Sequence, residues 1–230
     1  MEPGQHVILM GAQGAGKGTQ AERLAPALNL FHFSTGEAFR AAIAAQTKLG
    51  VLAKDYLDRG DLVPDDVTLG IVAAKLSEIA DDAARGGTTG ALFDGFPRTE
   101  SQAEGLSEEL ARRGEVIVAV IEIDVPRNEL IERLSGRRVC PTCGTVYHVT
   151  FNPPMVAGIC DKDGTALEQR ADDTPEAIER RLNLYFALTQ PLLNYYRELG
   201  LLETVDGTAS IEDVQREILN RVDARAARPA

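Results

Sequence analysis

The order in which apolar runs and helical patterns follow one another constrains the fold of this chain most. Short apolar runs alternate with longer stretches in which apolar residues recur at helical spacing. Strands that alternate with helices predict a parallel sheet, because parallel neighbours need a crossover connection that is usually a helix. The runs predicted to be strands lie at residues 6–10, 30–33, 91–93, 116–123 and 201–205.

The helical patterns predict helices on both faces of this sheet. They cover residues 18–28, 37–45, 65–79, 99–113, 126–135, 175–199 and 211–223. Two segments interrupt the alternation: residues 136–173 are rich in Gly, Pro, Asp and Cys, and residues 35–63 form a separate helical excursion. The sequence therefore predicts an α/β core from residues 1–34, 64–135 and 174–230, with two small inserts.

The charge and composition of the chain exclude several classes of protein. The 230 residues carry a formal net charge of −11, and an acidic chain repels a phosphate backbone, so nucleic-acid binding is not expected. Neither a signal peptide nor an apolar run of the roughly 20 residues that span a bilayer is found, so no membrane association is expected. Three cysteines, an odd number, do not indicate a disulfide framework, which favours a reducing cytoplasm.

A glycine-rich segment, GAQGAGKGT at residues 11–19, follows the first apolar run and opens a helical pattern. The spacing from Gly11 to Lys17 is that of a Walker A loop, whose glycines let backbone N–H groups surround a phosphate. The start of the following helix adds a positive dipole, and Lys17 would reach the β and γ phosphates. A glycine turn without a ligand is the alternative, but the strand, the helix and the lysine in register favour a nucleoside triphosphate site.

Six motifs then occur in one order along the chain. They are residues 11–20, 33–40 (FSTGEAFR), 61–65 (DLVPD), 94–99 (DGFPRT) with Gln102, 136–138 (GRR) and 170–173 (RADD). In this order and spacing the chain resembles the adenylate kinase family in its long-lid form, from His6 to about Thr208. The resemblance implies the P-loop nucleoside monophosphate kinase fold, with residues 35–63 as an AMP-binding lobe and residues 136–173 as a lid.

The resemblance implies that one group of residues binds AMP. Arg40 and Arg98 would hold its phosphate, and Gln102 would offer an amide donor and acceptor to the edge of adenine. Gly95 would allow close approach of the backbone. The AMP set is Thr35, Arg40, Asp61, Leu62, Val63, Gly95, Phe96, Pro97, Arg98, Gln102, Arg170 and Arg181.

A second group is implied to bind ATP and to act on the transferring phosphoryl group. The ATP set is Gly14, Ala15, Gly16, Lys17, Gly18, Thr19, Arg133, Arg137, Val146, Tyr147 and Ala209. The catalytic set, which would spread charge away from the phosphoryl oxygens, is Lys17, Arg98, Arg133, Arg137, Arg170 and Arg181. Asp94 would hold the waters of a Mg²⁺ ion bound with ATP. No general base is needed, because an AMP phosphate oxygen is already anionic at neutral pH.

The second insert contains the pattern of a metal site. The pair Cys140 and Cys143 is followed, after sixteen residues, by the pair Cys160 and Asp163. Paired two-residue gaps suit a tetrahedral Zn²⁺ ion, and carboxylate is an acceptable fourth ligand, as in the zinc-bearing lids of the family. An ion with four protein ligands would be structural. His148 and Asp161 are rival fourth ligands outside this register, and free thiols without metal are the alternative.

Two other functions compete with the one implied. Another nucleoside monophosphate kinase, for UMP or CMP, is less favoured because relatives of that kind commonly have Ala where this chain has Thr35, and because the lid is long. A zinc-ribbon module that binds nucleic acid conflicts with the acidic charge and with the lack of interleaved aromatic and basic residues. We therefore expect a cytoplasmic, monomeric enzyme that converts ATP and AMP to two ADP, without nucleic-acid or membrane partners.

Overall fold

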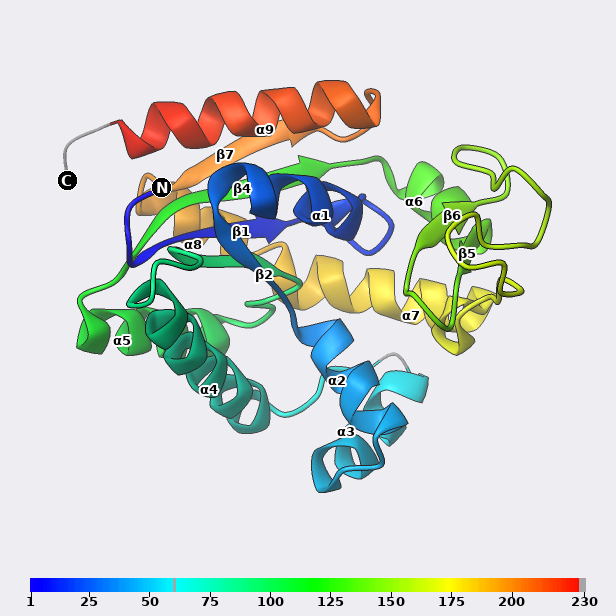
Figure 1. The fold of residues 1–230 in the computed structure, drawn as a ribbon, viewed down its shortest axis with the longest axis horizontal. Helices are drawn as coiled ribbons and strands as arrows, with labels where there is room; N and C mark the ends of the chain where they lie inside the picture. The colour runs from blue at the N-terminus through cyan, green and yellow to red at the C-terminus, as the bar shows by residue number, and fades with distance from the viewer. Residues whose placement is uncertain (60, 228–230) are drawn as a thin grey trace.

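A five-stranded parallel sheet forms the centre of the protein in the computed structural model, which describes residues 1–59 and 61–227 (Figure 1). The strands are β1 (Gln5–Met10), β2 (Leu30–Ser34), β3 (Gly90–Asp94), β4 (Val116–Asp124) and β7 (Leu202–Asp206). All predicted strands are confirmed to within a residue. The order is β2-β3-β1-β4-β7, so the chain winds in opposite directions on the two sides of β1. Ligands of open α/β sheets bind at such a switch point, beyond the carboxyl ends of the strands.

Helices cover both faces of this sheet, as predicted (Figure 1). The helices are α1 (Lys17–Leu28), α2 (Thr35–Ala44), α3 (Lys48–Arg59), α4 (Asp65–Ala83), α5 (Glu100–Arg113), α6 (Arg127–Ser135), α7 (Pro175–Leu184), α8 (Leu192–Glu198) and α9 (Ile211–Ala226). Several begin at a residue whose hydroxyl caps the first turn, among them Ser34, Thr99 and Ser210. Among residues 1–59 and 61–227, no helix has both the length and the apolar character needed to cross a bilayer.

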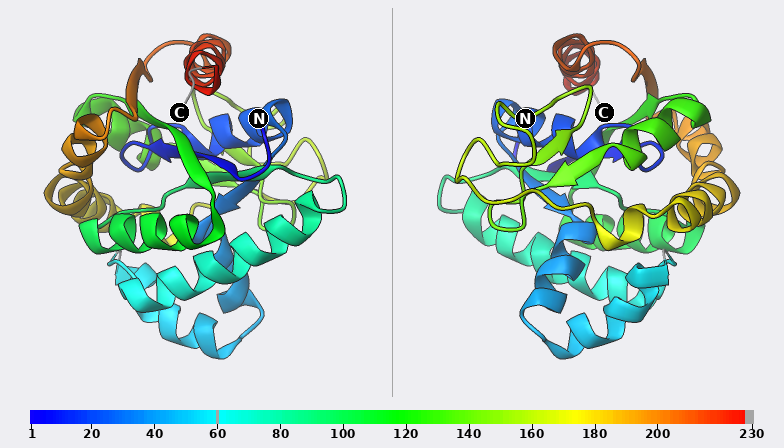
Figure 2. Two further views of the ribbon diagram at one scale, coloured as in Figure 1. Left: turned by 90° about the vertical axis from the view of Figure 1, so that its left-hand side faces the viewer. Right: turned by 90° about the vertical axis from the view of Figure 1, so that its right-hand side faces the viewer.

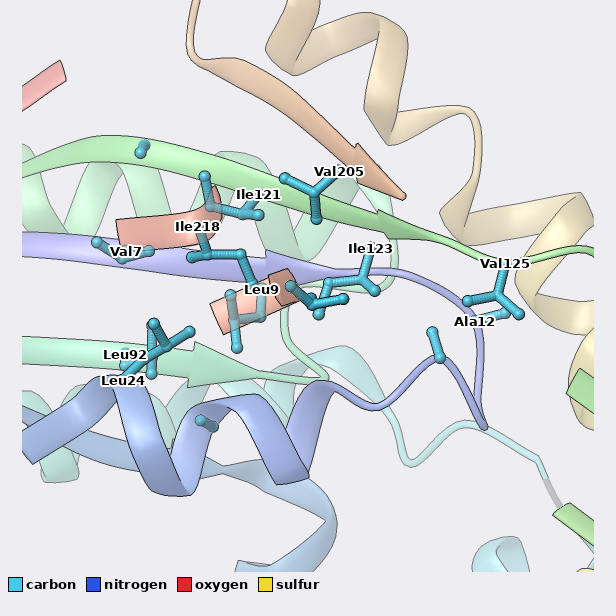
Figure 3. Packing of buried hydrophobic residues seen from close by; sticks show 14 of the residues in the cluster. Val7, Leu9, Ala12, Leu24, Leu92, Ile121, Ile123, Val125, Val205 and Ile218 are labelled. Carbon is cyan, nitrogen blue, oxygen red and sulfur yellow. The ribbon is translucent and has the colours of Figure 1, made fainter. Parts of the chain in front are cut away.

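Two apolar clusters hold the helices to the sheet, because successive strand residues point to opposite faces. Val7 and Leu9 of β1 lie in one cluster with Leu24 of α1 and Ile218 of α9 (Figure 3). Ile8, between them in sequence, lies in the other cluster with side chains of α4, α5 and α8. Burial of these aliphatic side chains on both faces explains why the strands read as continuous apolar runs.

The two inserts leave the core at the carboxyl ends of the strands. The first insert (residues 35–63) contains α2 and α3, which pack around a small apolar cluster; in both views of Figure 2 these helices project on the side opposite α9. The second insert (residues 136–173) contains an antiparallel hairpin, β5 (Arg137–Val139) and β6 (Val146–His148). It ends in a short 3₁₀ helix, η1 (Ala171–Asp173), against which α3 packs.

One predicted helix is wrong in its extent. The pattern over residues 175–199 is divided in the structure: α7 ends at Leu184, a π-helical segment spans Tyr185–Thr189, and α8 begins at Leu192. Pro191 lies at the break, where its missing N–H removes a hydrogen bond of a continuous helix. Apolar spacing persists through the segment because all its parts face the same core, so periodicity alone did not reveal the break.

Candidate active site

A cavity of about 590 Å³ opens beyond the carboxyl ends of the strands, between the loop after β1 and the second insert. Within the described chain, seven cationic and five acidic side chains line it, the reverse of the charge balance of the whole chain. The cations are Lys17, Arg40, Arg98, Arg133, Arg137, Arg170 and Arg181. Positive charge gathered in one cavity of an acidic chain is the signature of an anion site.

The loop between β1 and α1 forms one wall of the cavity and is shaped for phosphate. Gly14 and Gly16 have φ angles of 88° and 95°, in the left-handed region that glycine adopts without strain. Gly16 is the N-cap of α1 and supplies no side chain to occupy the free N–H groups of the first turn. These donors and the helix dipole are therefore available to an anion.

Lys17 stands at the mouth of this loop among other cations. Its Nζ donates to the carbonyl oxygens of Gly11 and Ala12, at 2.7 and 2.9 Å. Burial, together with the charges of neighbouring arginines, lowers the pKa of Lys17 to about 8 against the opposing effect of Asp94. Burial likewise lowers the pKa values of Arg98 and Arg170 to about 10. The protein thus holds several positive charges close together, and a bound polyphosphate would offset the repulsion between them.

Asp94, the last residue of β3, is a buried carboxylate in this positive environment. Burial alone would raise its pKa, but contact with His32 and the charge of Lys17 lower the pKa below the ordinary value, so Asp94 is ionised. The Nε2 atom of His32 lies 3.5 Å from Oδ2 of Asp94. An ionised carboxylate beside a polyphosphate site can hold the waters of a hydrated Mg²⁺ ion.

A smaller cavity adjoins the first and is lined by α2, the loop at residues 61–63 and the start of α5. Gly95 and Arg98 line both cavities and therefore connect them. The Nε atom of Arg98 donates to the carbonyl oxygen of Gly95 at 2.7 Å, and a Cβ atom at Gly95 would lie 2.9 Å from Nη2 of Arg98. Gly95 has a φ of 74°, in the left-handed region that favours glycine, and any larger residue there would also displace the end of the Arg98 side chain.

Acidic residues at the base of the second insert orient two of the arginines. Arg137 donates through Nε to Oδ2 of Asp173 at 2.7 Å, and the Asp173 side chain is fully buried. Arg181 donates to the carbonyl oxygen of Asp172 at 3.0 Å and pairs with its carboxylate at 2.9 Å. Buried ion pairs of this kind fix the orientation of the arginine side chains more than they add to the stability of the fold. They aim both guanidinium groups at the large cavity.

The structure brings the predicted residues together as two neighbouring groups. All members of the ATP set line the large cavity. Within the AMP set, the smaller cavity is lined by Thr35, Asp61, Leu62, Val63, Gly95, Arg98 and Gln102, and the larger one by Arg40, Gly95, Arg98, Arg170 and Arg181. Phe96 and Pro97 are buried and, in the part of the chain described, line neither of the two cavities.

Some lining and supporting residues were missed by the sequence analysis. His148, Phe151 and Asn152 of the second insert line the large cavity, where the ring of Phe151 stacks on His148 with centroids 4.5 Å apart. No spacing rule identifies them, because the hairpin alone brings them there. Asp65 and Asp173, which orient other side chains, are the last residues of the motifs at 61–65 and 170–173. A carboxylate at the end of a motif could therefore have identified them.

Four side chains of the second insert converge as a candidate metal centre. One ligand atom from each of Cys140, Cys143, Cys160 and Asp163 lies within 4.8 Å of all the others. The Sγ atoms of Cys143 and Cys160 are 3.6 Å apart, and Sγ of Cys140 is 3.3 Å from Oδ2 of Asp163. Tetrahedral zinc with bonds of about 2.3 Å separates its ligand atoms by about 3.8 Å. The donor set and its spacing fit Zn²⁺.

The rival fourth ligands are engaged elsewhere. Nδ1 of His148 accepts from the backbone N–H groups of Thr150 and Phe151, both at 3.0 Å, and Oδ1 of Asp161 accepts from Met155 at 2.9 Å. Asp163 also accepts from a backbone N–H, that of Thr165 at Oδ1, which lowers its pKa, but its Oδ2 atom stays 3.3 Å from Sγ of Cys140 within the cluster. The cluster in the described chain thus contains Asp163 and neither rival.

Comparison with known proteins connects this geometry to a family. A family model described as "Adenylate kinase" matches residues 9–201. The chain is 51% identical over 214 residues to the adenylate kinase of Carboxydothermus hydrogenoformans, covering 93% of this chain and 97% of that relative. It is 49% identical over 218 residues to the adenylate kinases of Staphylococcus aureus and Staphylococcus epidermidis, covering 95% of this chain and 99% of each relative.

Proposed function

This chain belongs to the adenylate kinase family, and from that premise we propose that its two adjoining cavities are the sites of ATP and AMP. As a member of this family, the protein is a phosphotransferase that passes a phosphoryl group reversibly from ATP to AMP and yields two ADP. One observation carries the assignment: Gly95 and Arg98 line both cavities, so the phosphate ends of two nucleotides would meet at the same buried guanidinium. A coupled assay of ADP formation from ATP and each nucleoside monophosphate tests it.

Transfer at this site rests on position and charge. The catalytic set would be Lys17, Arg98, Arg133, Arg137, Arg170 and Arg181, all of which line the large cavity. These cations would stabilise negative charge on the phosphoryl oxygens in the transition state. The attacking AMP oxygen is anionic at neutral pH, so no carboxylate needs to remove a proton. Mg²⁺, when bound with ATP, would neutralise phosphate charge, with Asp94 holding its waters.

AMP is expected to be the preferred acceptor, because Gln102 at the wall of the smaller cavity can pair with the edge of adenine. Gln102→Ala should lower kcat/KM for AMP by roughly tenfold or more and change kcat at saturating AMP much less. Steady-state kinetics with AMP, CMP and UMP measure both effects. Equal efficiency of the parent enzyme with all three monophosphates would contradict the assignment.

We propose three functional parts: a core of residues 1–34, 64–135 and 174–230, an AMP-binding lobe of residues 35–63, and a lid of residues 136–173. Each small part has an apolar cluster of its own, around Phe39 in the lobe and around Tyr147 in the lid. The lobe contacts helix α7 of the core through an ion pair of 2.6 Å between Asp61 and Arg180. Parts with separate clusters and few connections can move as units.

Both small parts are expected to close over the nucleotides, because phosphoryl transfer to water must be prevented. Val51 of the lobe and Met155 of the lid are 69% and 85% exposed, so labels there should not disturb packing. Distances from each label to a label on the core should shorten when a bisubstrate analogue binds. Unchanged distance distributions with and without the analogue would rule out closure.

We propose that the cysteine and aspartate cluster holds one structural Zn²⁺ ion per chain. The apolar cluster of the lid consists of Cys140, Tyr147 and Cys160 with Leu167 packed against it, and two of these four are themselves ligands. A core this small needs a metal or a disulfide to fold stably. The cysteines are free thiols in the described chain, which leaves them available to a metal.

We further propose that the enzyme acts as a monomer in the cytoplasm, on ATP, AMP and ADP alone. The net charge of −11 disfavours both nucleic acid and anionic membrane surfaces. Thiolate ligands persist in a reducing compartment, whereas an oxidising one favours disulfides.

A further inference from the structure

The amide of Gln102 is held on two sides by groups of fixed hydrogen-bonding polarity. The residue is 2% exposed and lines the smaller cavity. Its Nε2 atom donates to Oδ1 of Asp65 at 2.6 Å, and its Oε1 atom accepts from the backbone N–H of Arg98 at 2.8 Å. A carboxylate ion can only accept and a backbone N–H can only donate, so a single orientation of the amide satisfies both neighbours.

Asp65 is itself fixed between the starts of two helices. Its Oδ2 atom accepts from the hydroxyl of Thr99 at 2.8 Å, and the same hydroxyl caps α5 by accepting from the backbone N–H of Gln102 at 3.2 Å. Asp65 is also the first residue of α4, where the helix dipole favours a negative charge. The carboxylate therefore has little freedom to follow a rotating amide.

We propose that Asp65 is a positioning residue that sets base specificity, locking the Gln102 amide in the orientation that accepts a 6-aminopurine monophosphate and rejects a 6-oxopurine. The inference rests on the proposed role of the smaller cavity as the AMP site. With both anchors in place, Gln102 still has one N–H and one oxygen lone pair for a ligand. Adenine presents a matching acceptor at N1 and donor at the 6-amino group, whereas hypoxanthine presents a donor at N1–H and an acceptor at O6.

Recognition of hypoxanthine would require the amide to rotate by half a turn. Oε1 would then face the carboxylate of Asp65 and the NH₂ group would face the N–H of Arg98, leaving two buried contacts of like polarity. Sites that pair a polar group of the substrate reject the mismatched analogue strongly for this reason. Without the carboxylate of Asp65, one of the two penalties would disappear.

The variant Asp65→Asn tests this directly, because its amide has the shape of the carboxylate but can present either oxygen or nitrogen to Gln102. We expect the ratio of kcat/KM for AMP to that for IMP to fall by at least about tenfold, mainly through KM. Turnover at saturating AMP should stay within about twofold of the parent. Asp65→Ser, whose hydroxyl also donates or accepts, should lower the ratio too and provides a second variant if Asp65→Asn folds poorly.

Asp66→Asn is the matched control. Asp66 lies in the same first turn of α4 but is exposed, so its replacement removes the same charge without touching Gln102. The AMP to IMP ratio should be unchanged in Asp66→Asn, with melting temperatures measured for all variants. An equal fall of the ratio in Asp66→Asn would overturn the proposal, since the helix charge would then be the cause.

Gln102→Ala separates failure of this proposal from failure of the site assignment. If Gln102→Ala lowers the AMP to IMP ratio while both Asp65 variants keep it, Asp65 does not orient the amide and the inference is overturned, although the AMP site stands. If neither Gln102→Ala nor the Asp65 variants change the ratio, the smaller cavity does not recognise the base. The AMP-site assignment and the inference about Asp65 are then both wrong.

Discussion

Replacing Lys17 or Arg98 with alanine is expected to lower turnover by roughly 10²–10³-fold, the usual cost of removing one charge-stabilising group. Both side chains line the large cavity, Lys17 at the phosphate loop and Arg98 at the junction with the smaller cavity. Since the cations act as a unit, the losses in the double variant should be less than the product of the two single losses. The coupled assay of ADP formation measures each effect.

The fold of both variants should remain intact for an electrostatic reason. Burial lowers the pKa values of Lys17 and Arg98, which means that the folded protein without nucleotide disfavours their charged forms. Removing either cation relieves repulsion among the remaining arginines, so the melting temperature should fall little or rise. Arg112→Ala is the control, because that side chain is 70% exposed on α5 and should leave turnover unchanged. Near-normal turnover of a folded Lys17→Ala or Arg98→Ala enzyme would refute the assigned roles.

Removing zinc is expected to unfold the lid at a lower temperature while the core still binds AMP. The lid has only a small apolar cluster, and without a cation its cysteine and aspartate ligands would bring like charges together whenever the thiols ionise. Metal analysis should find about one zinc per chain in the parent protein. Limited proteolysis after chelation should cut within residues 136–173 before it cuts the core.

Variants of the fourth ligand make the zinc prediction specific. Loss of an outer-shell partner already weakens metal binding by about 10–100-fold, so Asp163→Ala should weaken it by at least that much. Asp163→Cys should retain zinc, because thiolate is a favoured ligand. Asp161→Ala is the control, since Asp161 bonds to the backbone of Met155 outside the cluster. A zinc content near zero in protein never exposed to chelator would falsify the site.

The sequence alone determined which segments form the five strands of the sheet, most of its helices and the phosphate loop, because each depends on residues close together in the chain. Strand burial on both faces appears as an apolar run, and helix faces appear as a period near 3.6. The loop at residues 11–19 is equally local: covalent spacing sets Lys17 relative to its glycines. For the same reason the paired cysteine spacing was sufficient to predict the cluster of Cys140, Cys143, Cys160 and Asp163, which the structure brings together.

The tertiary structure decided which distant side chains meet. Gln102 and Asp65 are 37 positions apart, and Arg137 and Asp173 are 36 apart, so only the placement of their helices and loops makes them partners. The break near Pro191 and the inclusion of His148 in the cavity wall also depend on packing. The physical reason is that apolar patterns record which face of an element is buried, whereas the hydrogen-bonding partner of a polar side chain is set by whatever group the fold places within about 3 Å of it.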